Sequence, residues 1–233
     1  MKTNKEITIN LAAVAAFCIV VASPALVSSS CATPKTEQED TTIIREDSGI
    51  TALKYSSPEV PASIEFCGKT IDLSRFDRHE RMDRELLAFT YMHSTSLQML
   101  KKANRYFPIV EPILKENGIP DDFKYLMVIE SNMNPTARSS AGAAGLWQFM
   151  QGTGRDYGLE VNNNVDERYH IEKATRAACR YLKDAYAKYK DWVAVAASYN
   201  AGQARIASQL AKQDVDDSLD LQLVEETARY VYR

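Results

Sequence analysis

Cysteine and histidine are scarce in this chain of 233 residues, which contains four cysteines and three histidines. The histidines, His79, His93 and His170, are far apart, and none lies within metal-ligand spacing of another histidine or of a cysteine. Two cysteines fall within the first 31 residues, which leaves Cys67 and Cys179 for the folded part. Two distant cysteines make no metal site, so the sequence indicates neither zinc nor haem and we expect no cofactor.

Cys67 and Cys179 could pair as a disulfide in an oxidising compartment. Cys179, however, lies among Ala177, Ala178 and Tyr181 in a helical pattern, where a buried free thiol fits equally well. The sequence therefore leaves both states open, and we claim no disulfide.

An excess of positive charge is also missing. The chain has 28 basic and 31 acidic residues, a net charge of −3. Lys2, Lys5 and Glu6 lie in the first 31 residues, so the remainder of the chain holds 26 basic and 30 acidic residues, a net charge of −4. Because nucleic-acid binding generally needs a basic surface, we expect no nucleic acid partner.

The N-terminal apolar stretch, residues 11–21, is too short to cross a bilayer comfortably. Lys2 and Lys5 precede it, and Pro24 and three serines follow it before Cys31. This order is typical of an export signal, so we expect residues 1–31 to direct the protein to the cell envelope, in the periplasm.

Cys31 stands directly after small residues, like the cysteine that is lipidated in bacterial lipoproteins. Ser28 occupies a position where such signals prefer leucine, so plain cleavage nearby is the alternative to lipidation and membrane anchoring. The next residues are rich in Thr, Ser, Glu and Pro, a composition typical of a solvated tether. We therefore expect a signal over residues 1–31, a polar tether and N-terminal extension over 32–76, and a folded domain over 77–233.

The folded domain is predicted to be all-α, and the segment before it could hold a short extended piece around Ile64 and Phe66. Side chains at three- and four-residue spacing predict a helix over residues 78–106, and His93 is expected to pack in the core with the others on that stripe. The members of the stripe are Met82, Leu86, Phe89, His93, Leu97 and Leu100. Two further helices are predicted over residues 171–190 and 192–199.

Proline and glycine mark the boundaries between these helices. Pro108 and Pro112 predict a short helical turn that Gly118 ends as a C-cap. Asp121 is then expected to act as the N-cap of a helix over residues 122–131.

Glu130 lies near the end of this last helix, which directs a set of apolar side chains to a core: Phe123, Leu126, Met127 and Ile129. Burial against apolar groups disfavours a charged carboxylate and raises its pKa. The partial negative charge of a helix C-terminus acts in the same direction. Such a carboxyl group can serve as a general acid near neutral pH. Considered alone, however, Glu130 would more often be an exposed residue or a salt-bridge partner.

The residues after Glu130 favour the catalytic interpretation. Pro135 is expected to end the helix, and the polar loop through Ser139 and Ser140 can turn its hydroxyl groups towards the carboxylate. Gly142 and Gly145 let the backbone pass close to a ligand, where side chains would obstruct it.

Four residues that combine flat apolar surface with an amide come next: Trp147, Gln148, Phe149 and Met150. The amide of Gln148 can bind sugar hydroxyl groups, although Trp147 and Phe149, considered singly, are more often core residues. Later in the chain, the sequence Ser-Tyr-Asn-Ala-Gly over residues 198–202 places Tyr199 and Asn200 at a helix end.

Together these motifs resemble the soluble-type lytic transglycosylases, a lysozyme-like family that cleaves bacterial peptidoglycan, and their layout is closest to the membrane-bound type D members. The resemblance rests on Glu-Ser with a following Asn-Pro, on the glycine-rich motif that ends in Trp-Gln-Phe-Met, and on Tyr-Asn-Ala-Gly. A fourth motif, Glu-Thr-x-x-Tyr-Val, occupies residues 226–231. The resemblance implies a lysozyme-like, goose-type helical domain with a catalytic groove.

The resemblance assigns the catalytic acid to Glu130. It implies substrate-binding roles for Ser131, Ser139, Gln148, Met150, Tyr199, Asn200 and Tyr230. In particular, it implies that Tyr199 hydrogen-bonds the acid and that Tyr230 lines the groove. The family normally continues its last helix beyond this motif, whereas the sequence stops at Arg233, so we expect a short final helix or a clipped product.

Most glycoside hydrolases use two carboxylates, and we find no second one tied to these motifs. Asp121 is expected to be a cap, Asp156 has no evident partner, and Asp166 and Glu167 are expected in a solvated loop. A single acid suits the chemistry that the resemblance implies. Glu130 protonates the oxygen between MurNAc and GlcNAc, the N-acetyl group stabilises C1, and Glu130 then takes the proton of the C6 hydroxyl.

The expected product is a 1,6-anhydro-MurNAc end. The expected partners are peptidoglycan glycan strands and, through a lipid anchor, a membrane, with the protein as a monomer. A goose-type lysozyme, in which water attacks, is the nearest alternative. A catalytically idle peptidoglycan-binding lipoprotein is another.

Overall fold

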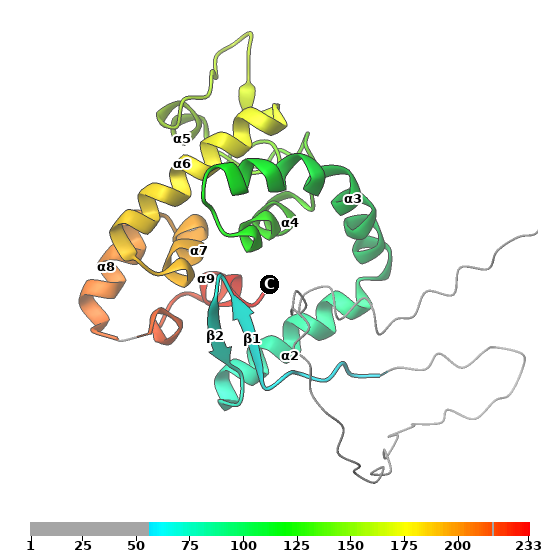
Figure 1. The fold of residues 1–233 in the computed structure, drawn as a ribbon, viewed down its shortest axis with the longest axis vertical. Coiled ribbons are helices and arrows are strands. Elements are labelled where there is room, and N and C mark those ends of the chain that lie inside the picture. Colours follow the sequence, from blue (N-terminus) through cyan, green and yellow to red (C-terminus); the bar gives the residue numbers. More distant parts are fainter. Residues whose placement is uncertain (1–55, 216) are drawn as a thin grey trace, which may run out of the picture. The chain divides into compact units, whose positions relative to one another are not determined.

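Helices dominate the computed structural model, which describes residues 56–215 and 217–233 (Figure 1). The α-helices are α2 (Phe76–Tyr91), α3 (His93–Glu116), α4 (Leu126–Ser131), α5 (Gln151–Asp156), α6 (Ile171–Tyr189), α7 (Trp192–Ala201), α8 (Gln203–Gln213) and α9 (Glu225–Tyr230). Short 3-10 helices are η2 (Asp121–Tyr125), η3 (Glu167–Tyr169) and η4 (Ser218–Asp220). The prediction of an all-α class is confirmed.

The expected export signal, Cys31 and most of the expected tether lie outside the described residues. Within the described residues, none of the helices combines the length and the apolar character needed to cross a bilayer.

A two-stranded antiparallel hairpin, β1 (Ser63–Phe66) and β2 (Lys69–Asp72), precedes the helices. Cys67 and Gly68 form its turn, and both have positive φ, as a two-residue hairpin turn requires. Ile71 and Leu73 are buried against side chains of α2, α7 and η4. The compact unit accordingly begins at Val60, so the last part of the range expected to be a tether, residues 32–76, is folded. The extended piece expected around Ile64 and Phe66 is confirmed as β1.

The helix predicted over residues 78–106 is in fact two helices that meet at Met92. The carbonyl group of Phe89 accepts a hydrogen bond from the Ser96 hydroxyl (2.7 Å), and the chain bends there. The apolar stripe therefore does not continue on one face, and His93 and Leu97 are exposed. The prediction that His93 packs in the core is wrong.

Pro108 and Pro112 lie inside α3, so the prediction that they interrupt the helix is also wrong. Both prolines are exposed. Each lacks the N–H that would bond to the carbonyl group four residues earlier, and on this exposed side of the helix that carbonyl group can bond to water instead. The prediction for the end of the helix is confirmed. Gly118 has φ +66, its N–H donates to Lys115 and that of Ile119 donates to Leu114, which is a Schellman C-cap.

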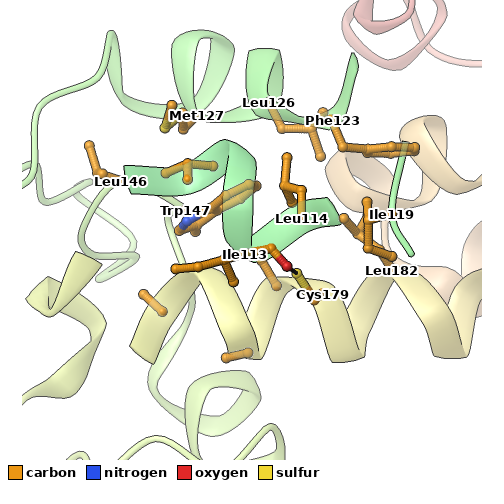
Figure 2. Packing of buried hydrophobic residues seen from close by; sticks show 14 of the residues in the cluster. Ile113, Leu114, Ile119, Phe123, Leu126, Met127, Leu146, Trp147, Cys179 and Leu182 are labelled. Carbon is orange, nitrogen blue, oxygen red and sulfur yellow. Dashed lines mark hydrogen bonds between the residues drawn. The ribbon is translucent and has the colours of Figure 1, made fainter. Parts of the chain in front are cut away.

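The main core joins α3 and α6 with the segments around Glu130 (Figure 2). Its largest fully buried side chains include Leu114, Phe123, Met127, Trp147 and Leu182.

Cys179 lies in this core and is a free cysteine, as is Cys67. The Cys179 thiol is 4.0 Å from the carbonyl oxygen of Ile113, and burial raises the pKa of the thiol to about 11.

The helices predicted over residues 171–190 and 192–199 are confirmed as α6 and α7. Their N-caps explain where they begin, since His170 and Asp191 accept hydrogen bonds from Lys173 and Val193. The shorter α5 and the helix α8 were not predicted.

Leu114→Ala is expected to lower the free energy of unfolding by about 2–5 kcal/mol, because Leu114 is fully buried in the main core and its truncation leaves a cavity. Leu97→Ala, the same change in the same helix at a side chain that is 48% exposed, is the matched control and should have a small effect. Urea unfolding of the two variants measures the difference, and equal losses would contradict the described packing.

Candidate active site

Glu130 lies in the last turn of α4, a helix of six residues that follows η2 without a break. Asn132 and Met133 both adopt positive φ, so the chain turns away directly after the helix. The helix thus ends before Pro135, which was expected to end it. Glu130 is held near a helix C-terminus and is partly buried, as the sequence predicted.

The start of this segment differs from the prediction for Asp121. Asp121 belongs to the first turn of η2 and makes no capping hydrogen bond. Its carboxylate instead pairs with Lys124 (2.5 Å), because the chain enters through a 3-10 turn. The neighbouring Asp122 accepts the backbone N–H of Cys67 (2.7 Å) and ties the hairpin to η2.

Tyr230 on α9 is the tyrosine that contacts the glutamate. Its hydroxyl group donates a hydrogen bond of 2.6 Å to Oε1 of Glu130. Tyr199 on α7, to which the resemblance assigned this bond, donates instead to the carbonyl oxygen of Trp147 (2.7 Å). The roles of the two tyrosines are therefore corrected, since α9 rather than α7 supplies the donor.

The pKa of Glu130 is raised above its ordinary value. Burial is the largest cause, because it disfavours the charged form. The negative charge of Glu226 raises this pKa further, whereas the hydrogen bond from Tyr230 and the positive charge of Arg233 lower it. Burial and the nearby Glu130 also hold the pKa values of Tyr230 and Tyr199 well above their ordinary range, with burial as the larger cause.

Glu226 is a carboxylate near the site that the sequence did not connect with Glu130. It is exposed and lies on α9, four residues before Tyr230. Side chains four residues apart share a helix face, which explains why both act on Glu130. The motif over residues 226–231 contained this signal, because its first and fifth residues have that spacing.

The serines and the glutamine assigned to substrate binding shape the loop after α4 in this structure. Ser131 Oγ lies 2.9 Å from the carbonyl oxygen of Met127 and 3.0 Å from that of Leu146, so it links the helix end to the loop. Ser139 Oγ accepts the N–H of Ala143 (3.0 Å).

Gln148 has φ +48, and its amide donates to the carbonyl oxygens of Gly145 (2.8 Å) and Ala137 (3.3 Å). Of the other residues assigned to substrate binding, Met150 is exposed, and Asn200 accepts a hydrogen bond from Thr227 on α9 (2.8 Å).

Trp147 and Phe149 are buried, as core side chains are. The indole N–H of Trp147 donates to the Thr175 hydroxyl on α6 (2.9 Å). The loop is therefore fixed to α6 by Trp147 and to α7 by Tyr199, whose hydroxyl group donates to the Trp147 carbonyl.

A buried arginine holds the same loop from the other side. Arg168 on η3 is 1% exposed, and Nη1 donates to the carbonyl oxygens of Gly142 (2.8 Å) and Phe149 (2.9 Å). Nε and Nη2 donate to the two carboxylate oxygens of Asp166 (2.8 and 2.7 Å). Asp166 is therefore the partner of a buried cation rather than part of a solvated loop. The sequence offered only an Asp-x-Arg spacing, which does not show burial.

Gly145 is required where the loop crosses η3. Its φ is +79, and a Cβ atom there would lie 1.9 Å from the carbonyl oxygen of Arg168. Gly145 was expected to let the backbone approach a ligand, whereas in the structure the close approach is to the backbone of η3.

The residues described here bring no three potential metal-binding side chains together. A partly buried carboxyl group beside a hydroxyl donor has features that general acid catalysis can use.

Parts of the chain are similar to known proteins. Residues 108–220 match the Transglycosylase SLT domain family. The chain is 31% identical over 157 residues to the membrane-bound lytic murein transglycosylase D of Escherichia coli K12, covering 65% of this chain and 34% of that protein. It is 33% identical over 95 residues to the peptidoglycan transglycosylase gp16 of Escherichia phage T7, covering 40% of this chain and 7% of that protein.

A solved structure of the lytic transglycosylase Slt from Pseudomonas aeruginosa aligns with a TM-score of 0.47 at 20% identity, over 67% of this chain and 32% of that one. Residues 108–220 are thus similar to the transglycosylase SLT domain, and the chain is similar to lytic transglycosylases, in agreement with the resemblance predicted from the motifs. It spans about a third of the length of the type D relative. Glu130 and Tyr199 fall within the matched residues, whereas α2 and α9 fall outside them.

Gly145→Ala is expected to lower the melting temperature strongly, because the new Cβ would collide with the backbone of Arg168 and force the loop off η3. Gly152→Ala is the matched control, since Gly152 lies in α5 and a Cβ there meets nothing within 4 Å. Thermal unfolding followed by circular dichroism compares the two. Equal melting temperatures would contradict the close contact between the loop and η3.

Proposed function

We propose that the protein is a peptidoglycan lytic transglycosylase that cleaves the MurNAc-(β1,4)-GlcNAc bond and leaves 1,6-anhydro-MurNAc ends. The observation that carries the proposal is the partly buried Glu130 with a raised pKa and a short hydrogen bond from Tyr230. The matched SLT domain supports the same substrate class.

In the proposed reaction, Glu130 is protonated when the glycan binds, because burial favours the neutral carboxyl group. It gives its proton to the glycosidic oxygen as the bond from that oxygen to C1 of MurNAc breaks, and GlcNAc leaves as an alcohol. The N-acetyl group of the substrate stabilises C1. Tyr230 stabilises the carboxylate that remains, because a hydrogen bond to the charged form favours that form.

Glu130 then acts as a base in the second step. It takes the proton of the C6 hydroxyl, whose oxygen forms the new bond to C1. The anhydro ring closes without water, and Glu130 returns to its protonated form, so one carboxylate completes the cycle.

The proposal also includes the location and the domain organisation of the protein. We assign residues 1–31 to an export signal, the polar segment after it to a tether, and residues 77–233 to the catalytic domain, with the hairpin packed onto it. The name of the E. coli relative includes "membrane-bound", which supports a location in the cell envelope. Lipidation of Cys31 and a monomeric state belong to the same proposal.

Glu130→Gln is expected to lower turnover of purified peptidoglycan by at least about 100-fold, because the amide cannot donate the proton. Binding to sedimented cell walls should be retained. Glu225→Gln is the matched control, since Glu225 is also acidic and close to the site but pairs with Arg84. Mass spectrometry of the released muropeptides measures both activity and product.

The wild-type products should be lighter by one water than hydrolysis products and should resist borohydride reduction. Reducible ends would replace the proposed reaction with hydrolysis of the lysozyme type. Full release by Glu130→Gln would remove Glu130 from its proposed role.

The pH dependence should separate the two α9 groups that act on Glu130. The basic limb of the kcat/KM profile reports the pKa of the acid in the free enzyme, and activity falls as pH rises through that value. Glu226→Gln removes a charge that raises this pKa, so the limb should move to lower pH. Tyr230→Phe removes a hydrogen bond that lowers it, so the limb should move to higher pH. Shifts in the same direction, or a shift in Glu225→Gln, would contradict this electrostatic account.

A further inference from the structure

Two neighbouring residues of α2 form ion pairs with α9. Glu85 accepts a hydrogen bond from Nε of Arg229 (2.5 Å), and its other carboxylate oxygen lies 3.8 Å from Nε of Arg233. The adjacent Arg84 pairs with Glu225. In Figure 1, α2 is coloured green-cyan and α9 red, because the two helices are far apart in the sequence. Glu85 and Arg229 are 144 residues apart along the chain.

The two pairs differ in their exposure to solvent. The side chains of Glu85 and Arg229 are 10% and 26% exposed, whereas those of Arg84 and Glu225 are 50% and 62% exposed. Removal of one partner of a largely buried pair leaves a charge without compensation and disturbs its surroundings, whereas exposed pairs contribute little. The Glu85–Arg229 pair is therefore the stronger link between the two helices.

This link ends next to the tyrosine that contacts the catalytic acid. Arg229 directly precedes Tyr230, whose hydroxyl group donates to Glu130. The helix α9 has only six residues, and a helix of that length does not hold its conformation without tertiary contacts. The hydrogen bond from Thr227 to Asn200 ties α9 to α7 as well.

We infer that Glu85 is a positioning residue of the active site, which holds α9 through Arg229 so that the Tyr230 hydroxyl reaches Glu130. This inference rests on the proposed function. It gives a role to α2 and α9, both of which lie outside residues 108–220, the part that matches the SLT domain family. The element that precedes the matched domain thereby completes the surroundings of the acid.

The position of the basic limb in the kcat/KM profile depends on the groups that face Glu130. Tyr230 and Glu226 act from α9, Arg233 from the segment after it, and Tyr199 from α7. Loss of the Tyr230 hydrogen bond moves the basic limb of the kcat/KM profile to higher pH, as argued above. A purely structural role of Glu85 would lower the melting temperature without moving this limb.

The experiment compares Glu85→Gln, Arg84→Gln, Tyr230→Phe and the double variant Glu85→Gln/Tyr230→Phe in the full chain. Glu85→Gln should move the basic limb to higher pH, as Tyr230→Phe does, and should lower kcat/KM by up to about 100-fold, the effect of a misplaced catalytic group. Arg84→Gln, which breaks only the exposed pair, should leave profile and rate unchanged.

The double variant should be no slower than Tyr230→Phe alone, because Glu85 acts through that hydroxyl group. Additive losses in the double variant, or an unshifted limb in Glu85→Gln, would overturn the inference. If Glu85→Gln does not fold, Arg229→Lys gives the same test, since it keeps the charge but replaces the Nε donor, and it should shift the limb in the same direction.

The outcome for Glu130→Gln separates this inference from the proposed function. Continued muropeptide release by Glu130→Gln would refute the proposed function itself. An inactive Glu130→Gln together with a Glu85→Gln that behaves like Arg84→Gln would refute only the role of Glu85.

Discussion

Withdrawal of the Glu130 carboxyl group from water is the constraint on which the rest of the site depends. A carboxylate in such surroundings costs free energy unless it is protonated or receives hydrogen bonds. Here burial favours the protonated form, and the Tyr230 hydroxyl supplies a donor for the charged form. That donor comes from a helix 100 residues further along the chain. The C-terminal segment must therefore fold back onto α4, which makes the contacts of α9 part of the site.

The loop after α4 needs hydrogen-bond partners from elsewhere in the protein, because its backbone groups lack the regular partners of a helix or sheet. Arg168 supplies donors for the carbonyl groups of Gly142 and Phe149, and Asp166 compensates the buried positive charge. Breaking a buried pair of this kind is far more costly than losing an exposed one. The absence of a side chain at Gly145 lets the loop rest directly on the backbone of η3. Ser131 then connects this rigid loop to the helix turn that carries Glu130.

Local features of this fold could be predicted from the sequence, and long-range partners could not. The helices α6 and α7 were predicted over nearly their full lengths, and the motif around Glu130 placed this residue near a helix end. Periodicity could not show the bend at Met92, which turns His93 out of the core. The resemblance assigned the donor to the wrong tyrosine, since Tyr199 and Tyr230 both come close enough to act on Glu130 and only packing decides which hydroxyl group bonds to it. Asp166 looked solvated because its partner is two residues away and the burial of that partner has no sequence pattern.

In the proposed reaction, Glu130 acts first as an acid and then as a base, so it needs a pKa that permits both roles. If the pKa of Glu130 were raised by burial and by Glu226 alone, the carboxylate would be a strong base that forms only with difficulty. If the hydrogen bond from Tyr230 acted alone, the group would lose its proton before the glycan bound. Both influences reach Glu130 from one face of α9, since Glu226 and Tyr230 are four residues apart on that helix. A displacement of α9 would therefore change the two opposing effects together, which explains why a short helix is tied to α2 and α7 by polar side chains.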